Sequence, residues 1–332
     1  MKLNLKLLKN KNILVTGGAG FIGSNLCEYL VNLNANVKCL DNLSTGYLKN
    51  IKNLISKPNF EFIKGDIYDY NICDKSTKGI DYVLHQAALG SVPRSVKDPI
   101  SSNKNNVDGF LNILVASKNN NVKRFVYASS SSLYGDSKDL PKVENIIGNP
   151  LSPYAINKFT NELYAMNFKK IYNFNSIGLR YFNVFGRRQD PDGSYAAVIP
   201  KFIKKLINYE SPLINGDGTF SRDFTYIDNI IQINICSILT NNNFALNQVY
   251  NAAYGERTSI LDLVKYLKNY LSHFDSKILK INPIHGPKRA GDIPHSLASI
   301  EKAKKNLNYL PLYSFKLGIE KSINWYWENL KK

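Results

Sequence analysis

A glycine-rich turn near the N-terminus constrains the fold of this chain more than any other feature. Gly17, Gly20 and Gly23 are spaced as Gly-x-x-Gly-x-x-Gly directly after the apolar run of residues 12–16. Apolar residues then recur at helical spacing, at Leu26, Tyr29, Leu30 and Leu33. Glycines in such a turn let the backbone approach a pyrophosphate closely, and the N-terminus of the following helix attracts the anion. The segment therefore predicts a strand, a phosphate-binding loop and a helix.

The acidic residue that ends the next apolar run indicates which dinucleotide would bind. Residues 36–41 form a second strand-like run, and Asp41 lies near the spacing expected for the carboxylate that holds an adenosine ribose. A carboxylate there repels a 2′-phosphate, and residues 42–44 contain no arginine. We therefore expect NAD, and not NADP, as the cofactor.

Further apolar runs alternate with helical stretches along the first half of the chain. Residues 60–63, 81–84 and 124–128 each lead into polar or small residues. Strands separated by helices favour right-handed crossovers and a parallel sheet that binds ligands at the carboxyl ends of its strands. We expect an α/β fold, with a Rossmann-type doubly wound parallel sheet and a smaller C-terminal α/β substrate-binding domain. The expected cofactor domain covers residues 1–182 and receives segments from about 223–252, and the second domain covers residues 183–332.

The composition argues against several classes of protein. The 332 residues carry a formal net charge of +17, but the lysines are dispersed and asparagine is abundant. No basic stripe is interleaved with aromatic residues, so nucleic acid is not an expected partner. No apolar run reaches the length of about 18 residues that crosses a membrane, and residues 1–8 lack the apolar core of an export signal. The four cysteines have neither metal nor redox spacing, which predicts reduced thiols in a cytoplasmic protein without a bound metal: Cys27, Cys39, Cys73 and Cys236.

A tyrosine and a lysine one helical turn apart are the first candidate catalytic groups. Ser152 is a typical helix N-cap and Pro153 a typical first helical residue, which places Tyr154 and Lys158 on one helical face. A free phenol has a pKa of ~10, and action as a base at neutral pH requires a downward shift of about three units, roughly 4 kcal/mol. The lysine charge, together with a cationic nicotinamide ring, could supply that shift. Taken alone, the spacing also fits an ordinary amphipathic helix.

Three motifs together resemble the extended short-chain dehydrogenase/reductase superfamily. They are the glycine turn, the serine run before Tyr134-Gly135, and the Tyr154–Lys158 pair. Residues 178–186 and 222–227 resemble the nucleotide-sugar epimerase/dehydratase branch of that superfamily. The resemblance implies NAD that stays tightly bound and is regenerated in each cycle. It also implies a set of cofactor-binding residues: Gly17, Gly20, Phe21, Ile22, Gly23, Asp41, Asn42, Asp66, Ile67, Gln86, Ala87, Asn106, Tyr154, Lys158 and Tyr181. For Asp66, assigned to the adenine, and Asn106, assigned to the nicotinamide ribose, the alternative is a polar loop or cap residue.

The serine run indicates the reaction. The 4,6-dehydratases of the family carry Thr-Asp-Glu at the positions that are Ser130, Ser131 and Ser132 here, and its glucuronate decarboxylases keep the glutamate. Without a carboxylate, reversible oxidation is the chemistry left to the site, which favours a 4-epimerase. The resemblance then implies that Tyr154, as phenolate, takes the proton of the sugar 4-hydroxyl while Ser130 hydrogen-bonds the same oxygen. Lys158 would hold the nicotinamide ribose, and a shift of the serine role to Ser131 stays open.

The second half of the chain is expected to bind the nucleotide end of the substrate. The resemblance implies substrate ligands at Ser130, Ser131, Asn183, Arg222, Arg289 and Asp292. Asn183 would bind the diphosphate, the two arginines phosphate and uridine groups, and Asp292 the ribose. Arginine suits phosphate because its planar fork donates two hydrogen bonds and keeps its charge. A local ion pair between Arg222 and Asp223 is the alternative, and Arg187-Arg188 is interpreted as a surface pair.

One position bears on the choice of sugar. The gatekeeper of the family falls at Ser296, where epimerases restricted to glucose and galactose place a tyrosine. A serine leaves room for a 2-N-acetyl group, although an ordinary turn serine is the alternative. Residues 89–95 and 187–191 also resemble the bacterial UDP-N-acetylglucosamine 4-epimerases that serve surface polysaccharides.

These features together predict the substrate pair and the assembly. We expect a homodimer, formed through two long helices of the cofactor domain, that interconverts UDP-GlcNAc and UDP-GalNAc. A UDP-glucose or UDP-glucuronate 4-epimerase is the alternative, and a non-enzymatic NAD-sensing protein of the same fold is a further one.

Overall fold

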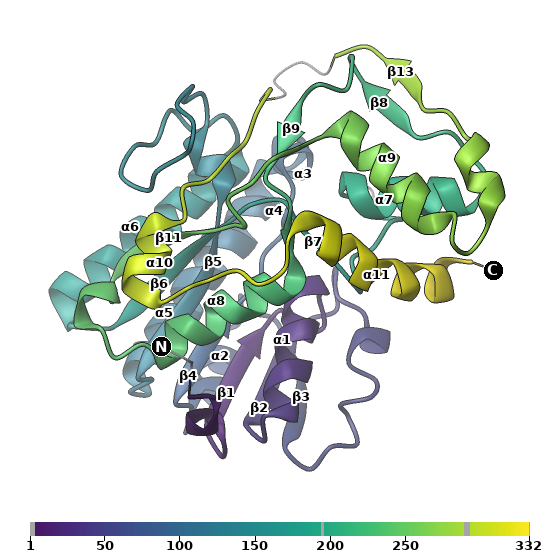
Figure 1. The fold of residues 1–332 in the computed structure, drawn as a ribbon. Helices are drawn as coiled ribbons and strands as arrows, with labels where there is room; N and C mark the ends of the chain where they lie inside the picture. The colour runs from purple at the N-terminus through teal and green to yellow at the C-terminus, as the bar shows by residue number, and fades with distance from the viewer. Residues whose placement is uncertain (1–3, 194–195, 289–292, 332) are drawn as a thin grey trace.

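A seven-stranded parallel sheet forms the centre of the part of the chain that the structure describes (Figure 1). The computed structural model describes residues 4–193, 196–288 and 293–331. The strand order is β11-β6-β5-β4-β1-β2-β3, and each pairing in this sheet is parallel. The strands are β1 (Asn12–Thr16), β2 (Asn36–Asp41), β3 (Phe60–Lys64), β4 (Tyr82–His85), β5 (Arg124–Ser130), β6 (Ser176–Tyr181) and β11 (Gln248–Ala252). The order reverses between β1 and β4, and doubly wound sheets bind their ligands at such a switch point.

Helices cover both faces of this sheet (Figure 1). On one face lie α1 (Phe21–Asn32) and α8 (Ile227–Leu239), and on the other α2 (Tyr70–Thr77), α5 (Gly109–Asn119) and α6 (Pro153–Tyr172). Ile13 and Val15 of β1 belong to the hydrophobic cluster of the first face, whereas Leu14 belongs to that of the second. Since successive side chains of a strand point to opposite faces, an apolar run such as β1 supplies both clusters. This architecture confirms the predicted Rossmann-type α/β fold.

A smaller α/β lobe lies beside the sheet (Figure 1). Three of its helices pack on one another: α7 (Val198–Ile207), α9 (Ile260–Leu271) and α11 (Phe315–Leu330). Short strands pair as β7 (Val184–Phe185) with β10 (Thr225–Tyr226), β9 (Ser221–Arg222) with β12 (Thr258–Ser259), and β8 (Leu213–Asn215) with β13 (Ile284–Gly286). The other described α-helices are α3 (Val92–Lys97), α4 (Pro99–Asn103) and α10 (Glu301–Leu307).

The chain crosses between the two lobes more than once. After β10 it returns to the central sheet, where α8 packs against β5 and β11 pairs with β6. We therefore propose a cofactor domain made of residues 1–182 together with about 223–252, and a substrate domain made of the rest of residues 183–332.

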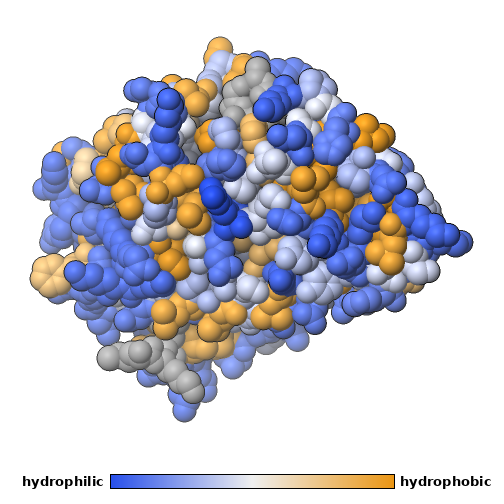
Figure 2. Space-filling model, turned by 45° about the horizontal axis from the view of Figure 1, so that its top comes forward, coloured by the Kyte–Doolittle hydropathy of each residue, from blue (hydrophilic) through white to orange (hydrophobic). Residues whose placement is uncertain are grey.

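The visible surface mixes polar and apolar side chains, and the cysteine thiols are buried. On the face in Figure 2, hydrophobic residues form small patches separated by hydrophilic ones. Within the described ranges, no helix combines the length and the apolar character that a membrane crossing requires. Cys27, Cys39, Cys73 and Cys236 are buried free thiols. The same described residues contain no group of three or more histidine, cysteine or acidic side chains that could hold a metal ion.

Candidate active site

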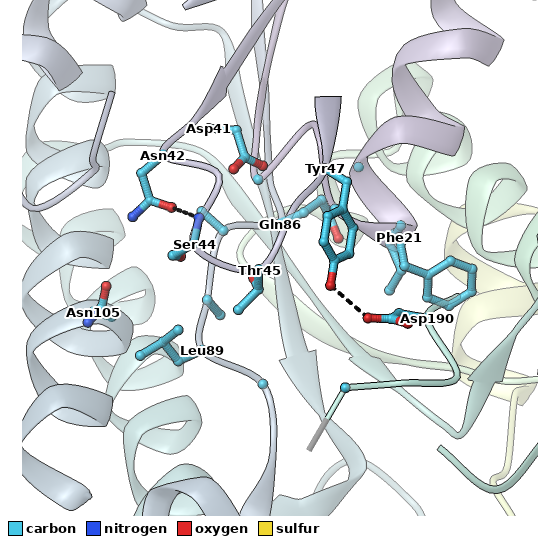
Figure 3. Close-up of a pocket in the computed structure, with 18 of the residues that line it drawn as sticks. Phe21, Asp41, Asn42, Ser44, Thr45, Tyr47, Gln86, Leu89, Asn105 and Asp190 are labelled. Carbon is cyan, nitrogen blue, oxygen red and sulfur yellow. Dashed lines mark hydrogen bonds between the residues drawn. The ribbon is translucent and has the colours of Figure 1, made fainter. Parts of the chain in front are cut away.

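A cleft of about 580 Å³ opens at the carboxyl ends of the strands on either side of the switch point (Figure 3). The loops that follow β1, β2, β3 and β4 form most of its wall. Many of the cofactor-binding residues expected from the sequence line it: Gly17, Gly20, Phe21, Ile22, Gly23, Asp41, Asn42, Asp66, Ile67, Gln86 and Ala87. The fold thus brings four separate loops together around one elongated space.

The glycine turn is shaped for close backbone contacts. Gly17 has φ +65°, and a Cβ there would lie 2.7 Å from the backbone nitrogen of Ala87. A Cβ on Gly23 would lie 2.1 Å from the carbonyl oxygen of Gly17. Gly20 directly precedes α1, so the free N–H groups of the first helical turn face the cleft. This cradle, which side chains would fill, fits a dinucleotide pyrophosphate.

The acidic residues expected at the adenosine end are held by hydrogen bonds. Asp41 accepts hydrogen bonds from the N–H groups of Ala19, at 2.9 Å, and Leu43, at 2.7 Å. The carboxylate of Asp66 accepts a hydrogen bond from the Asn42 amide at 2.8 Å. These contacts fix the positions of both carboxylates, and each oxygen keeps a second lone pair that can accept from a ribose or an adenine.

Two other expected cofactor residues lie behind the wall of the cleft. The amide of Asn106 bonds both backbone groups of Leu89, at 2.7 Å and 3.2 Å, and its neighbour Asn105 is the residue that lines the cleft. Tyr181 donates a hydrogen bond to the side-chain oxygen of Gln86 at 3.0 Å. Both residues therefore hold wall residues in place, and their direct contact with NAD stays a prediction.

The tyrosine–lysine pair lies on the buried face of α6. The hydroxyl of Ser152 accepts the N–H of Ala155 at 3.2 Å, so the helix begins where the sequence predicts. The Lys158 ammonium lies 5.9 Å from the centre of the Tyr154 ring and donates to the Ala128 carbonyl at 2.8 Å. Burial lowers the pKa of Lys158 to about 8. This group is therefore a cation that gives up its proton more readily than a surface lysine.

Ser130, at the end of β5, is close enough to the Tyr154 phenol to influence its pKa. Burial raises the pKa of the Tyr154 phenol above its ordinary value, and the Ser130 contact lowers it. The protein groups around Tyr154 therefore do not by themselves produce the lowered phenol pKa that the neighbouring lysine was expected to cause. Ser130 also accepts the N–H of Ser132 at 3.1 Å, which caps the short turn Ser131–Tyr134. The contact with the phenol favours Ser130 over Ser131 as the partner of Tyr154.

The expected substrate residues lie at the edge of the smaller lobe. The amide of Asn183 donates to the Asp223 carbonyl at 3.4 Å. The Arg222 guanidinium donates to the Ser221 carbonyl at 3.0 Å and to the Pro294 carbonyl at 3.1 Å. Arg289 and Asp292, the other two expected nucleotide ligands, lie outside the described residues.

The Asp223 carboxylate, which the sequence offered as an alternative partner of Arg222, is held by backbone groups. The Asp223 carboxylate accepts backbone N–H groups of Tyr254, Gly255 and Ala298 at 3.1–3.4 Å. Burial raises its pKa to about 7. Asp223 therefore ties together three segments of the smaller lobe through backbone hydrogen bonds.

The gatekeeper position lies on the neighbouring segment. The Ser296 N–H donates to the Ser221 carbonyl at 3.0 Å, which places this half-buried serine beside the strand that carries Arg222. The segment around Ser296 is thus attached to the proposed phosphate-binding strand.

The sequence interpretation missed a contact that crosses the cleft. Tyr47 and Asp190 line opposite walls, and the Tyr47 hydroxyl donates to the Asp190 carboxylate at 2.8 Å (Figure 3). The pair comes from loops 143 positions apart, so no local pattern could have revealed it. Arg94, from α3, also lines the cleft and was not predicted.

The interpretation of Arg187 and Arg188 as a surface pair is wrong. Arg187 donates to Asp228 at 2.7 Å, and Arg188 donates to Glu28 at 2.6 Å and to the Ser24 carbonyl at 3.1 Å. These bonds attach the loop that carries Asp190 to α1 and α8. In the sequence, this arginine pair stands between Gly186 and the turn-like residues 189–191, and that position was the available indication of a structural role.

The fold and the cleft define a class of protein. A glycine cradle at the switch point of a doubly wound parallel sheet, with an acidic residue after the second strand, is the site of a Rossmann-type dinucleotide-binding enzyme. A profile described as the NAD dependent epimerase/dehydratase family matches residues 13–253. The chain belongs to this family, so NAD is its cofactor and it is an isomerase of the nucleotide-sugar 4-epimerase type.

Solved structures and relatives agree with this assignment. The UDP-N-acetylglucosamine 4-epimerase of Methanobrevibacter ruminantium, solved with UDP-N-acetylmuramic acid, is 40% identical with a TM-score of 0.89, over 96% of this chain and 98% of that one. The UDP-glucuronic acid 4-epimerase of Bacillus cereus, solved with UDP-glucuronic acid and NAD, is 32% identical with a TM-score of 0.85, over 95% and 98%. The UDP-glucose 4-epimerase of Mycolicibacterium smegmatis is 31% identical over 94% of this chain and 97% of its own length.

Proposed function

We propose that this enzyme interconverts UDP-GlcNAc and UDP-GalNAc by inverting C4 of the sugar through a transient 4-keto form. The observation that carries the proposal is the grouping of Ser130, Tyr154 and a buried Lys158, whose ammonium lies 5.9 Å from the centre of the Tyr154 ring, in a protein whose cleft fits NAD. The product pair would supply precursors of surface polysaccharides.

Each protein group has one task in the proposed reaction. Tyr154 takes the proton of the 4-hydroxyl, and Ser130 donates a hydrogen bond to the same oxygen. Lys158 stays protonated and stabilises the phenolate by its charge. Held by cleft residues such as Gly17, Gly20 and Asp41, NAD would supply reversible hydride exchange with C4 of the sugar. Because desolvation raises the pKa of the Tyr154 phenol, the charge of Lys158 and that of a bound nicotinamide would both favour its ionisation.

The nucleotide end of the substrate would be held by the smaller lobe. Arg222 lies on β9 and Asn183 directly precedes β7, both short strands of the smaller lobe, and Arg289 and Asp292 follow β13 in the sequence. A fixed diphosphate would allow the sugar to turn and to present either face to the cofactor, which would accept the hydride in the first half of the reaction and donate it in the second.

An assay of three UDP-sugars without added cofactor tests the proposal. UDP-GlcNAc, UDP-glucose and UDP-glucuronate are incubated separately with the purified protein and separated by chromatography. We expect conversion of UDP-GlcNAc to UDP-GalNAc. The relatives named for glucose and glucuronate supply the alternatives. Conversion of UDP-glucuronate with UDP-GlcNAc left unchanged would overturn the substrate assignment, and no conversion at all would favour an NAD-sensing protein.

Substitution of the gatekeeper tests the sugar preference. In Ser296→Tyr we expect kcat/KM to fall about tenfold more for UDP-GlcNAc than for UDP-glucose, because the ring would occupy the space of the N-acetyl group. Ser296→Ala is the matched control, since it removes the hydroxyl and leaves the space open. An equal loss on both sugars in Ser296→Tyr would show that residue 296 does not contact the 2-substituent of the sugar.

An apolar stripe on the outside of α6 supports the proposed homodimer. Ile156, Phe159, Leu163 and Met166 repeat at intervals of three and four residues, and Ile156, Leu163 and Met166 are 53%, 45% and 48% exposed. Such a repeat is the pattern by which helices pack side by side. Light scattering should report twice the chain mass for the wild type and a shift toward the monomer for Leu163→Glu. Leu310→Glu, at an exposed position outside α6, is the control. A monomeric wild type would contradict the proposal.

A further inference from the structure

The catalytic face of α6 carries a third polar residue at the same spacing. Tyr154, Lys158 and Glu162 follow one another at four-residue intervals, so they share one face of the helix. Glu162 is buried, and its carboxylate accepts the hydroxyl of Ser129 at 2.5 Å. Since Lys158 bonds the carbonyl of Ala128, α6 holds the two β5 residues that directly precede Ser130.

The carboxylate of Glu162 is also paired with an arginine from the next strand. Arg180 of β6 donates from Nε to Oε1 at 2.9 Å and from Nη2 to Oε2 at 2.8 Å. Its remaining Nη1 donates to the Glu144 carbonyl at 3.0 Å, and its guanidinium lies 5.1 Å from the centre of the Tyr134 ring. Arg180 is 3% exposed, so its charge and that of Glu162 are balanced by each other and not by water. Such a pair holds its neighbours in one arrangement.

We propose that Glu162 is a positioning residue of the epimerisation site, which fixes Ser130 against Tyr154 through Ser129 and keeps Lys158 protonated through its charge. The inference rests on the proposed function for the roles of Ser130, Tyr154 and Lys158. The bonds that carry it belong to the protein alone.

The charges around Lys158 give the sign of the electrostatic effect. Burial lowers the pKa of Lys158, and the Glu162 carboxylate raises it. His85 at the end of β4 is also within electrostatic reach, but burial lowers its pKa to about 3, so it is neutral at pH 7. The other titratable groups around this pair, among the described residues, include Tyr154 on the same helix, Tyr127 on β5, Arg180 on β6, Lys302 on α10, Glu144 and Tyr134. Removal of the Glu162 charge should therefore lower the pKa of Lys158, and the lysine should lose its proton at lower pH.

Substitution of Glu162 in the NAD-loaded enzyme tests the proposal with two readouts. Glu162→Gln removes the charge, and Glu162→Asp keeps the charge on a side chain that is one methylene shorter. The first readout is an NMR titration of isotope-labelled lysine, with the Lys158 signal assigned by its loss in Lys158→Arg. The second is kcat across the pH range. We expect Glu162→Gln to lower the pKa of Lys158, and the alkaline limb of kcat, by about half a unit or more. In Glu162→Asp both should stay close to wild type, while kcat falls because Ser129 is displaced.

Two further variants make the result decisive. Glu162→Gln combined with Arg180→Gln removes both buried charges, which avoids an unpaired guanidinium if the single variant does not fold. It should still lower the pKa of Lys158, by less than the single variant, because the loss of the Arg180 cation offsets part of the effect of losing the Glu162 charge. Glu320→Gln, at an exposed position of α11, is the control and should change neither readout.

The outcomes separate this inference from the proposed function. An unchanged pKa of Lys158 in Glu162→Gln and in the double variant, with kcat reduced equally at every pH, would overturn the inference and leave Glu162 a structural residue. A shifted pKa in a protein that converts no UDP-sugar would instead overturn the proposed function and leave the link between Glu162 and Lys158 standing.

Discussion

Tyr154→Phe is expected to lower kcat by about a thousandfold, the middle of the range for loss of a general base. The substitution removes one oxygen, so the remaining ring can keep its packing and Lys158 can keep its bond to the Ala128 carbonyl. NAD content and UDP-sugar affinity should therefore stay close to wild type. Turnover is measured by chromatography of the UDP-sugars, and NAD content by release from the denatured protein.

A tyrosine elsewhere on the same helix supplies the control for this variant. Tyr172 lies in the last turn of α6 and is 49% exposed, so Tyr172→Phe makes the same chemical change away from the cleft. Turnover of Tyr154→Phe within a few fold of wild type would remove this residue from the role of base. Loss of NAD together with turnover would instead indicate a structural defect.

Gly23→Ala is expected to abolish NAD binding and to destabilise the fold. The added Cβ would lie 2.1 Å from the Gly17 carbonyl oxygen and 2.7 Å from the Cα of Gly18. Both atoms belong to the backbone of the phosphate loop, so relief requires the loop to move away from α1. Overpacking of this kind costs about 1–3 kcal/mol. Denaturant unfolding measures the free energy, and the NAD content of the purified protein measures binding.

Gly90→Ala is the matched control for the glycine substitution. Gly90 lines the same cleft, and no atom beyond its own chain neighbours lies within 4 Å of the position that its Cβ would take. We expect this variant to keep its NAD and its stability. If Gly23→Ala also kept both, the close approach of α1 to the phosphate loop would not be required for cofactor binding.

Local patterns were sufficient for the elements that build the cofactor site. The strand expected at residues 36–41 is β2, Asn36–Asp41, and the runs at 12–16 and 124–128 became β1 and most of β5. The helix that carries Tyr154 begins at Pro153 behind its Ser152 cap. These features depend on residues close together in the chain, such as a cap, a glycine turn or an apolar alternation.

The contacts between distant segments could not be read in the same way. Ser129 and Glu162 are 33 positions apart, and Tyr47 and Asp190 are 143 apart. The raised pKa of Tyr154 is another such property, because it depends on how deeply the assembled protein buries the phenol. Arg187 and Arg188 look like an exposed pair until the fold brings Asp228 and Glu28 to them.

The sequence by itself determined the class of this protein, because the glycine spacing, Asp41 and the Tyr154–Lys158 interval are each a local feature that NAD binding or NAD-dependent catalysis requires. The tertiary structure alone decided which groups hold those residues in place and how strongly burial shifts their protonation. Hydrogen bonds and desolvation act through space, and the neighbours of a buried side chain are set by the packing of the whole sheet and not by the order of the residues.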